Sequence, residues 1–379
     1  LARHGAQFAQ IFGWERTRWY DRSGEGERYS FRRSNWWNAV KDEAMAVRER
    51  VGLMDLSTFA KFEVKGRDAF AFLNRICANK VPEKDGGIIL THLLNANGFI
   101  ESELTITRLA ADHFYVLSAA AAQLYDKDQL TWRMSDADDV SITDVTDDYG
   151  VLILAGPKSR DVLKTVTDTD LSSPSFRWLT AKTRTVAGVD GVRLLRMTYV
   201  GELGWELHVP RAGMQAVFDA LMKAGAPHGL SLFGTYAMNS LRMEKGYRGW
   251  GSELTAEIDM FEASMERFIR LDKPDFTGKA ASLSRRQKGP RMKLVYMSVD
   301  NTDSDCVGNE PVYQNGKVVG VTTSGAFGHA TGKSLAFAYV PPDATAEGTA
   351  FDILMFGEMR KARIISESIW DPDNARIRV

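Results

Sequence analysis

The stretch from Tyr199 to Glu206, Tyr-Val-Gly-Glu-Leu-Gly-Trp-Glu, lies between two apolar segments with the character of strands. Gly201 and Gly204 allow a tight backbone turn that residues with a Cβ would make only with strain. Such a turn can aim Glu202 or Glu206 into a cavity, where a carboxylate suits a ligand edge with adjacent N–H donors. The alternative interpretation is a hairpin whose glutamates are solvated.

Three further segments occur with this turn in one order along the chain. They are Leu94–Leu104 (LNANGFIESEL), Ser240–Gly251 (SLRMEKGYRGWG) and Asp272–Lys279 (DKPDFTGK). Together the four segments resemble the glycine-cleavage T-protein (aminomethyltransferase) family, most closely the folate-binding half of dimethylglycine and sarcosine dehydrogenases. The resemblance covers nearly the whole chain, and it implies an α+β fold. The implied domains are a folate-binding body of duplicated α/β subdomains, residues 1–287, and a C-terminal antiparallel β-barrel, residues 288–379.

The pattern after Pro290 indicates the same barrel independently of the resemblance. Short strand-like segments alternate there with Gly, Pro, Asn and Asp, and Asn315-Gly316 is the strongest hairpin signal in the chain. A small antiparallel barrel is the natural arrangement of such strands. The expected strands are 292–299, 311–314, 317–324, 334–340, 349–354 and 359–365.

The residues before Pro290 read as mixed α/β structure. Apolar residues at helical spacing predict helices over 36–51 and 68–76, and the segment 51–62 reads as extended. Period-two patterning predicts a hairpin around Ala111-Asp112-His113. A strand, a glycine turn and a helix occur at residues 62–68 and again at residues 152–160. This recurrence indicates an internal duplication.

Composition limits the possible classes of function. The 379 residues include 48 Lys and Arg against 49 Asp and Glu, so the net charge is −1. The length predicts two or three domains, and the scattered, balanced charge gives no support for a nucleic-acid partner. No run of about 18 apolar residues exists, so we expect no membrane partner. Because the chain starts at Leu1, we expect a trimmed, processed or excised chain.

The cysteines, histidines and glycines narrow the choice of cofactors. Cys77 and Cys306 make neither a disulfide framework nor a zinc cluster, which favours a reducing compartment. We expect a cytoplasmic protein, or a mitochondrial matrix protein if the source is eukaryotic. None of the six histidines has a metal-ligand spacing, so no metal is predicted. No GxGxxG follows a strand, so the sequence predicts no FAD site in this chain.

The resemblance implies tetrahydrofolate as the cofactor and one-carbon transfer as the reaction. In the dehydrogenases of this type, flavin oxidation of a methylated amine leaves an iminium, whose carbon passes to tetrahydrofolate to give 5,10-methylenetetrahydrofolate. The implied partners are a methylated amine such as dimethylglycine or sarcosine and a flavin dehydrogenase domain or subunit. The protein must supply a pteridine cavity, a carboxylate near the reacting nitrogens and exclusion of water.

Glu103 and His92 are the predicted catalytic residues. The family places an aspartate after its Gly-Gly-Ile segment, and the matching position here is Glu103, preceded by Ser102. Glutamate keeps the charge but moves the carboxylate by roughly 1 Å, which a reacting centre must accommodate. His92 is the one histidine near the predicted site and is a candidate proton acceptor. The alternative for Glu103 is an outward-facing strand residue that alternates with Leu104.

Four residues are predicted to bind the cofactor on the strength of the resemblance. Glu206 matches the pteridine-binding glutamate, and Glu202 is the neighbouring alternative. Tyr199 would stack on the ring or fill core. Arg242 matches an arginine directed at the folate site, although an exposed pair with Glu244 on one helix is equally compatible with the spacing.

Three more positions line the expected pocket. Trp250 lies where the family has a segment that feeds the pocket, although packing alone would also explain it. Leu90 and Ser118 stand where the family often has a tyrosine and an asparagine near the folate or the reacting centre. These departures indicate either retuned substrate chemistry or a decayed site.

Three functions therefore remain open. The first is the tetrahydrofolate-dependent transfer described above, catalysed by an aminomethyltransferase that works with an amine dehydrogenase. The second is demethylation of a sulfonium compound or an aryl methyl ether, giving 5-methyltetrahydrofolate. The third is a non-catalytic module with a folate-binding fold that serves assembly or regulation.

Overall fold

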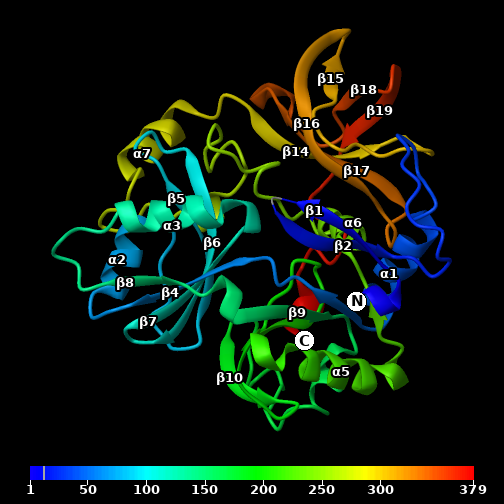
Figure 1. Ribbon diagram of the computed structural model, residues 1–379. Coiled ribbons are helices and arrows are strands. Elements are labelled where there is room, and N and C mark those ends of the chain that lie inside the picture. The colour runs from blue at the N-terminus through cyan, green and yellow to red at the C-terminus, as the bar shows by residue number, and fades with distance from the viewer. Residues whose placement is uncertain (12) are drawn as a thin grey trace.

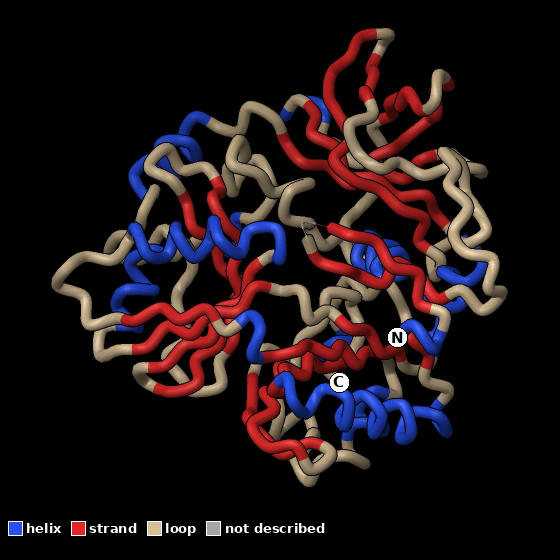
Figure 2. The backbone as a smooth tube through the Cα atoms, in the orientation of Figure 1, coloured by secondary structure: helices blue, strands red, loops and turns tan. Residues whose placement is uncertain are grey.

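A computed structural model describes residues 1–11 and 13–379 of the chain. Figure 1 shows a body that contains two sheets, drawn in blue to green, and a barrel, drawn in orange and red. The strands of the two large body sheets and of the barrel stand out in Figure 2. This architecture confirms the predicted α+β body followed by a C-terminal antiparallel barrel.

The first body sheet has five strands in the order β5-β6-β7-β4-β8, and all neighbouring pairs are antiparallel. The hairpin predicted around Ala111-Asp112-His113 joins β6 to β7. Helices α2 (Ala69–Ile76) and α3 (Gln123–Trp132) belong to this half of the body. The strands are β4 (Ala60–Lys65), β5 (Ile88–Leu94), β6 (Ile100–Ala110), β7 (His113–Ser118) and β8 (Ser141–Asp144).

The second body sheet has six strands in the order β10-β11-β12-β9-β3-β13. Helices α4 (Ser159–Leu163) and α5 (Met214–Gly225) pack on it. The segment 51–62, expected to be extended throughout, is divided between β3 of this sheet and β4 of the other. The strands are β3 (Gly52–Asp55), β9 (Tyr149–Ala155), β10 (Ala181–Val186), β11 (Val189–Leu195), β12 (Gly204–Pro210) and β13 (Ser231–Leu232).

The two body sheets repeat one connectivity, which confirms the predicted internal duplication. The order β4–α2–β5–β6–β7 in one half corresponds to β9–α4–β10–β11–β12 in the other, and in each the last strand pairs with the first. Gly66 and Gly156 end the equivalent first strands with φ values of 137° and 124°. A Cβ at Gly66 would lie 2.0 Å from the Asp139 carbonyl oxygen, so the repeated turn needs glycine in this half.

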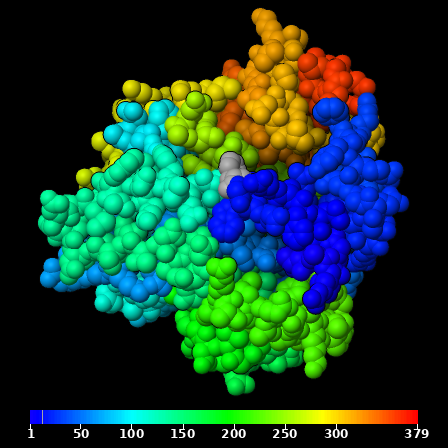
Figure 3. Space-filling model, viewed as in Figure 1, coloured from blue at the N-terminus to red at the C-terminus, as the bar shows by residue number. Residues whose placement is uncertain are grey.

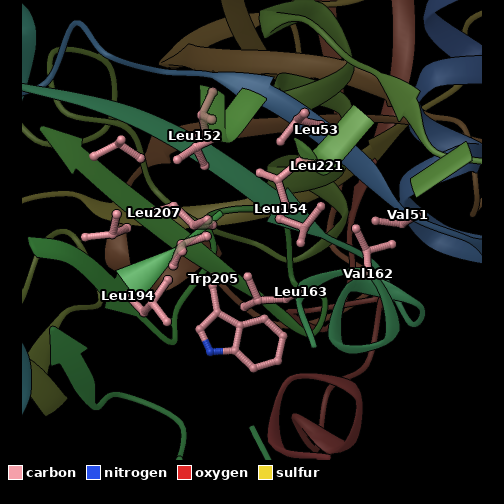
Figure 4. Packing of buried hydrophobic residues seen from close by; sticks show 14 of the residues in the cluster. Val51, Leu53, Leu152, Leu154, Val162, Leu163, Leu194, Trp205, Leu207 and Leu221 are labelled. Atoms are coloured by element: carbon pink, nitrogen blue, oxygen red, sulfur yellow. The ribbon is translucent and has the colours of Figure 1, made fainter. Parts of the chain in front are cut away.

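The core of the second half shows how strand alternation divides the residues between two faces. Leu152, Leu154, Trp205 and Leu207 point toward α4 and α5 and are essentially unexposed (Figure 4). Burying a leucine or aromatic side chain of this kind stabilises the fold by about 1.5–3 kcal/mol. The residues between them on the same strands, Glu206 among them, therefore face the opposite way.

The barrel is closed by six antiparallel strands in the order β14-β17-β16-β15-β18-β19. Asn315 and Gly316 form the β15–β16 turn with φ values of 51° and 75°, as the hairpin signal predicted. The domain boundary at residues 287 and 288 stays a prediction, and it falls at the end of α7 (Lys279–Lys288). The strands are β14 (Lys293–Val299), β15 (Pro311–Gln314), β16 (Lys317–Gly328), β17 (Lys333–Val340), β18 (Ala350–Met355) and β19 (Glu358–Ile364).

The two ends of the chain lie on the body. The hairpin of β1 (Ala6–Ile11) and β2 (Trp14–Tyr20) crosses the face between the second half and the barrel, as the blue residues in Figure 3 show. Strand β2 contacts α1 (Trp37–Glu49) and α6 (Thr235–Glu244). After β19 the chain returns from the barrel to the body and ends in α8 (Ala375–Arg378).

Candidate functional site

The polar residues predicted for the site gather where the two body sheets face each other. Strand alternation puts Leu90, His92 and Glu103 on one face of the first sheet and Glu206 and His208 on one face of the second. The two faces meet, because the Tyr115 hydroxyl of β7 lies 3.1 Å from His208 Nδ1 of β12. We call this space the seam.

Glu206 enters the seam because the preceding turn can form only with glycines. Gly201 has φ 72°, and a Cβ on Gly204 would lie 2.4 Å from the Leu154 carbonyl oxygen. Glu206 is 3 % exposed, which excludes a solvated hairpin glutamate. Its Oε2 lies 3.3 Å from His208 Nε2, whereas Oε1 has no hydrogen-bond partner among the residues that the structure describes.

Glu202 is engaged elsewhere, so its predicted contact with the cofactor is wrong for this structure. Its Oε1 accepts hydrogen bonds from Arg48 (3.0 Å), the Trp370 indole (2.9 Å) and Arg376 (3.0 Å), and its Oε2 accepts from Arg376 at 2.8 Å. The glutamate side chain is 1 % exposed. Both oxygens are therefore held by side chains of α1 and the C-terminal segment, and Glu206 is the carboxylate of this turn that faces the seam.

Glu103 and His92 lie opposite each other on β6 and β5. The distance from Glu103 Oε1 to His92 Nε2 is 3.4 Å, and the His92 ring is fully buried with neither nitrogen hydrogen-bonded. Phe268 packs edge-on against that ring, with centroids 6.2 Å apart. The Glu103 side chain is 21 % exposed, so it faces a buried histidine rather than bulk water. Glu103 thus shares the partly exposed face of β6 with Glu101 and alternates with buried Leu104, and its catalytic role stays a prediction.

Tyr199 and Arg242 lie beside Glu103. The Tyr199 hydroxyl donates to the Arg248 carbonyl, and its ring stacks on Tyr247 at 5.7 Å. Burial raises the pKa of Tyr199; the nearby charge of Arg242 opposes this rise and that of Glu103 adds to it. The tyrosine therefore packs against protein and also lies within electrostatic reach of the predicted catalytic carboxylate.

Arg242 is buried on α6 and does not form the exposed pair with Glu244 that its spacing allows. Its Nη1 donates to Glu253 Oε2 at 3.2 Å and to the Tyr247 carbonyl at 3.0 Å. Glu244 is fully buried and binds Arg48 instead, at 2.9 Å. The guanidinium of Arg242 is thus fixed between protein groups at the edge of the region that contains Tyr199.

Leu90 and Trp250 belong to one apolar wall. Both are partly buried and pack against the same cluster, which includes Leu94, Ile100 and Leu254. Where the family often has a tyrosine hydroxyl, Leu90 supplies only a hydrocarbon surface. Trp250 is therefore a packing residue of this wall, and the pocket side of the wall is apolar at these two positions.

Ser118 lies with residues on the other face of the first sheet. Its buried hydroxyl has no hydrogen-bond partner and is next to Asp126 of α3, whose Oδ1 accepts a hydrogen bond from Ser102. Burial raises the pKa of Asp126 to about 6, and the hydroxyls of Ser102 and Ser118 oppose the rise. Ser118 thus lies next to Asp126, a buried acid that the sequence did not predict. Ser118 itself does not lie near Glu206.

Two functional candidates escaped the sequence analysis. His208 stands two residues after Glu206 in a strand, so period-two alternation already placed it on the same face. Asp126 lies on a helix with a weakly amphipathic sequence, and only the packing of α3 on the sheet buries it. No sequence signal would have indicated its environment.

Other features of the molecule lie apart from the seam. A cavity of about 510 Å³ is bordered by Phe261, Ile269 and Lys293, and one of about 230 Å³ by Trp19 and Glu43. Within residues 1–11 and 13–379, no cluster of His, Cys, Asp or Glu has a metal-binding arrangement. No helix in this described part is long and apolar enough to span a membrane.

The fold of the chain is that of a solved aminomethyltransferase structure. The crystal structure of the glycine cleavage system aminomethyltransferase T from Bartonella henselae has the same fold, with a TM-score of 0.85 at 24 % identity over 98 % of this chain and 96 % of that one. The family model for the GCVT N-terminal domain matches residues 1–273, and that for the glycine cleavage T-protein C-terminal barrel domain matches residues 293–371. The chain belongs to the glycine cleavage T-protein family.

Relatives with longer chains share the same region. The chain is 39 % identical to rat mitochondrial dimethylglycine dehydrogenase over 97 % of its own length and 43 % of the relative's. It is 30 % identical to human mitochondrial sarcosine dehydrogenase over 100 % of its own length and 46 % of the relative's. The chain thus spans less than half the length of these relatives.

Proposed function

We propose that the seam binds tetrahydrofolate and that the chain transfers to it a one-carbon unit from a methylated amine of the dimethylglycine or sarcosine type. The product is 5,10-methylenetetrahydrofolate. Membership of the T-protein family and the likeness to amine dehydrogenases support this proposal. Because the chain corresponds to part of those relatives, the proposed source of the iminium is a flavin dehydrogenase domain or subunit.

One observation carries the proposal, namely the environment of the Glu206 carboxylate. The Glu206 side chain is 4 % exposed, and no described residue donates a hydrogen bond to Oε1. A ligand that brings its own donors can therefore use an acceptor that the protein leaves open. The adjacent N–H groups of a reduced pteridine are donors of the right geometry, since a carboxylate accepts two parallel bonds.

Glu103 and His92 supply the proton chemistry in this proposal. Bound tetrahydrofolate would supply the two nitrogens that take the carbon of the iminium, and the amine would leave with one of the two protons that those nitrogens lose. The Glu103 carboxylate would stabilise the positive charge of the iminium and accept the other proton. His92 lies 3.4 Å from Glu103 with free ring nitrogens, so it can take that proton onward. The apolar wall of Leu90 and Trp250 keeps water from the iminium, which would otherwise release formaldehyde.

In this proposal, Tyr199 and Arg242 shape the binding site and take no part in proton transfer. Tyr199 and Arg242 form the edge of the pteridine site next to Glu103. Both cysteines are buried and unpaired, which fits the proposed reducing setting in the cytoplasm, or in the mitochondrial matrix of a eukaryote.

Calorimetric titration with 5-formyltetrahydrofolate tests the proposal. We expect wild type and Glu103→Ala to bind, and Glu206→Ala to lose at least about tenfold in affinity because a charged hydrogen-bond acceptor is removed. Glu49→Ala, on the exposed side of α1, is the matched control and should bind like wild type. Unchanged binding by Glu206→Ala would contradict the proposed site.

Product analysis separates the two transferase chemistries. The chain is supplied with a flavin dehydrogenase, a methylated amine and tetrahydrofolate, and the folate product is identified. We expect 5,10-methylenetetrahydrofolate from wild type and free formaldehyde from Glu103→Ala. Formation of 5-methyltetrahydrofolate from a sulfonium or aryl ether donor would favour the demethylase, which the apolar Leu90 supports. Folate binding without any transfer would favour a regulatory module.

A further inference from the structure

Three buried groups form a hydrogen-bonded row across the seam. The Tyr115 hydroxyl lies 3.1 Å from His208 Nδ1, and His208 Nε2 lies 3.3 Å from Glu206 Oε2. The exposed fractions of Tyr115 and His208 are 0 %, and the rings are almost perpendicular at 87°. The row joins β7 of the first sheet to β12 of the second and ends at the carboxylate on which the proposed function depends.

His208 is held neutral by its surroundings. Burial lowers the pKa of its imidazole; the Glu206 carboxylate opposes this effect, whereas Lys61 and Arg193 reinforce it. The Lys61 ammonium is itself occupied by three backbone carbonyls, so it makes no hydrogen bond to the ring. The titratable and charged groups that act on the imidazole are Glu206 of β12, Tyr115 of β7, Lys61 of β4 and Arg193 of β11. Glu63 of β4 and Tyr149 of β9 bind Arg193 instead of the imidazole.

A neutral imidazole has one ring proton, and its two partners decide which nitrogen holds it. With the proton on Nε2, the ring donates to Glu206 Oε2 and accepts from the Tyr115 hydroxyl at Nδ1. With the proton on Nδ1, the Nε2 lone pair would face a carboxylate oxygen at 3.3 Å, which is repulsive unless Glu206 is protonated. The tautomer of His208 is therefore coupled to the charge of Glu206.

Arg193 strengthens the donor at the far end of the row. Its guanidinium carbon lies 4.3 Å from the ring centroids of both Tyr115 and Tyr149, so the cation is held between two aromatic faces. Glu63 and the Tyr149 hydroxyl accept hydrogen bonds from the same guanidinium. A cation over the Tyr115 ring makes its hydroxyl a better donor, which favours the arrangement with the lone pair on Nδ1.

We propose that His208, fixed by Tyr115, is a positioning residue that donates from Nε2 to Glu206 Oε2 and so aims Oε1 at the ligand. The inference rests on the proposed function, and it specifies the ligand edge as a neutral one that offers adjacent N–H donors. Without the Nε2–H donor, Oε2 would lose its partner and the carboxylate would no longer be held in one orientation.

Nitrogen NMR of the ligand-free protein tests the tautomer without any folate. A long-range ¹H–¹⁵N spectrum of wild type, compared with His208→Gln to assign the signal, should show His208 with its proton on Nε2 at neutral pH. Tyr115→Phe should broaden or shift the signal, because the hydroxyl that fixes Nδ1 as acceptor is lost. A proton on Nδ1, or an imidazolium, would overturn the proposal.

Ligand titration of His208 variants tests the consequence. Affinity for 5-formyltetrahydrofolate should fall about tenfold in His208→Leu, since the donor to Glu206 Oε2 is lost. His208→Gln should bind like wild type, because an amide can donate to Glu206 and accept from Tyr115. An equal loss in His208→Leu and His208→Gln would indicate a purely structural role and overturn the proposal.

Two controls separate this inference from the proposed function. Tyr149→Phe removes a hydroxyl that Arg193 binds and leaves both hydrogen bonds of His208 in place, so its affinity for 5-formyltetrahydrofolate should equal that of wild type. Absence of binding by folded wild type would contradict the proposed function, while the NMR result would still decide the tautomer. Binding that needs Glu206 but not His208 would overturn only the positioning role.

Discussion

Replacing Arg48 with methionine should destabilise the protein strongly, because this arginine is the only cation that Glu244 binds among the described residues. The Arg48 side chain is 1 % exposed and donates to Glu202 Oε1 at 3.0 Å and to Glu244 Oε2 at 2.9 and 3.1 Å. It also donates to the carbonyls of Val200 and Leu241, at 2.6 and 3.0 Å. The arginine thus joins α1 to the turn before Glu206 and to α6.

The magnitude follows from what remains after the substitution. Glu202 keeps its hydrogen bonds from Arg376 and Trp370, but Glu244 keeps only neutral donors from Ala330 and Thr331. Removing one partner of a buried ion pair costs about 3–5 kcal/mol, since the other charge stays buried. With an unfolding entropy of about 2.1 cal/mol/K per residue, the 379 residues would lose about 4–6 °C in Tm.

The loss should depend on pH in a direction that identifies its cause. In Arg48→Met, the isolated Glu244 carboxylate binds a proton in the folded chain at a pH where the unfolded chain does not. The deficit relative to wild type should therefore shrink as the pH falls from 8 to 5.5, by about 1–2 kcal/mol. Urea unfolding of wild type and variant at the two pH values measures this change.

Two variants make the measurement decisive. Arg48→Met with Glu244→Gln removes the isolated charge and should recover part of the loss at pH 8, leaving a deficit that hardly changes with pH. Arg67→Met, whose side chain is 77 % exposed, should change stability by less than about 0.5 kcal/mol. A deficit below about 1 kcal/mol in Arg48→Met, or one that grows at low pH, would refute the reasoning.

Three further predictions concern single positions. Gly204→Ala should lower the free energy of unfolding, measured in urea, by about 2–4 kcal/mol, because its Cβ would lie 2.4 Å from the Leu154 carbonyl oxygen. Gly188→Ala, with φ 77° and no atom near its Cβ, should lower it by only about 1 kcal/mol. Equal losses in the two variants would contradict the steric argument. The free energy of unfolding of wild type should fall by up to about 3 kcal/mol as the pH rises through the Asp126 pKa of about 6, since the folded protein binds this proton more tightly than the unfolded chain. Asp126→Asn should lack this dependence between pH 4.5 and 7.5. Gly316→Ala, at φ 75° in the barrel hairpin, should cost about 1 kcal/mol by thermal unfolding and leave the calorimetric affinity for folate unchanged.

Features encoded by neighbouring residues were predictable from the sequence. The Asn315-Gly316 turn, the barrel strands around it and the repeated strand–glycine–helix unit each depend on local backbone preferences, and the structure contains all of them. Period-two alternation also places Glu206 and His208 on one face of a strand, although it does not say whether that face meets a cavity or solvent.

Contacts between residues distant in sequence were not predictable. The choice between Glu202 and Glu206 depends on Arg48 and Arg376, which lie 154 and 174 residues from Glu202. Similarly, Arg242 and Glu244 have helical spacing that suits a surface pair, yet α6 is buried and each residue finds a different partner. Spacing identifies residues that can contact each other within one element, but tertiary packing decides which distant residues they bind in the folded protein.

The duplication explains why the candidate site lies in the seam. Strands β7 and β12 occupy equivalent places in the two halves, and the side chains that meet across the seam, Tyr115 and His208, come from these two strands. Two copies of one unit that pack face to face would present similar surfaces if their sequences were alike, and the seam would then be a second apolar core. Here the helix-facing positions of both copies are largely apolar, while the seam-facing positions combine a small apolar cluster, which includes Ile88, Leu117 and Leu195, with carboxylates, imidazoles and cations. Substitutions on the two faces should therefore have separable effects. Those at helix-facing positions should mainly lower stability, and those at seam-facing positions should mainly lower ligand affinity.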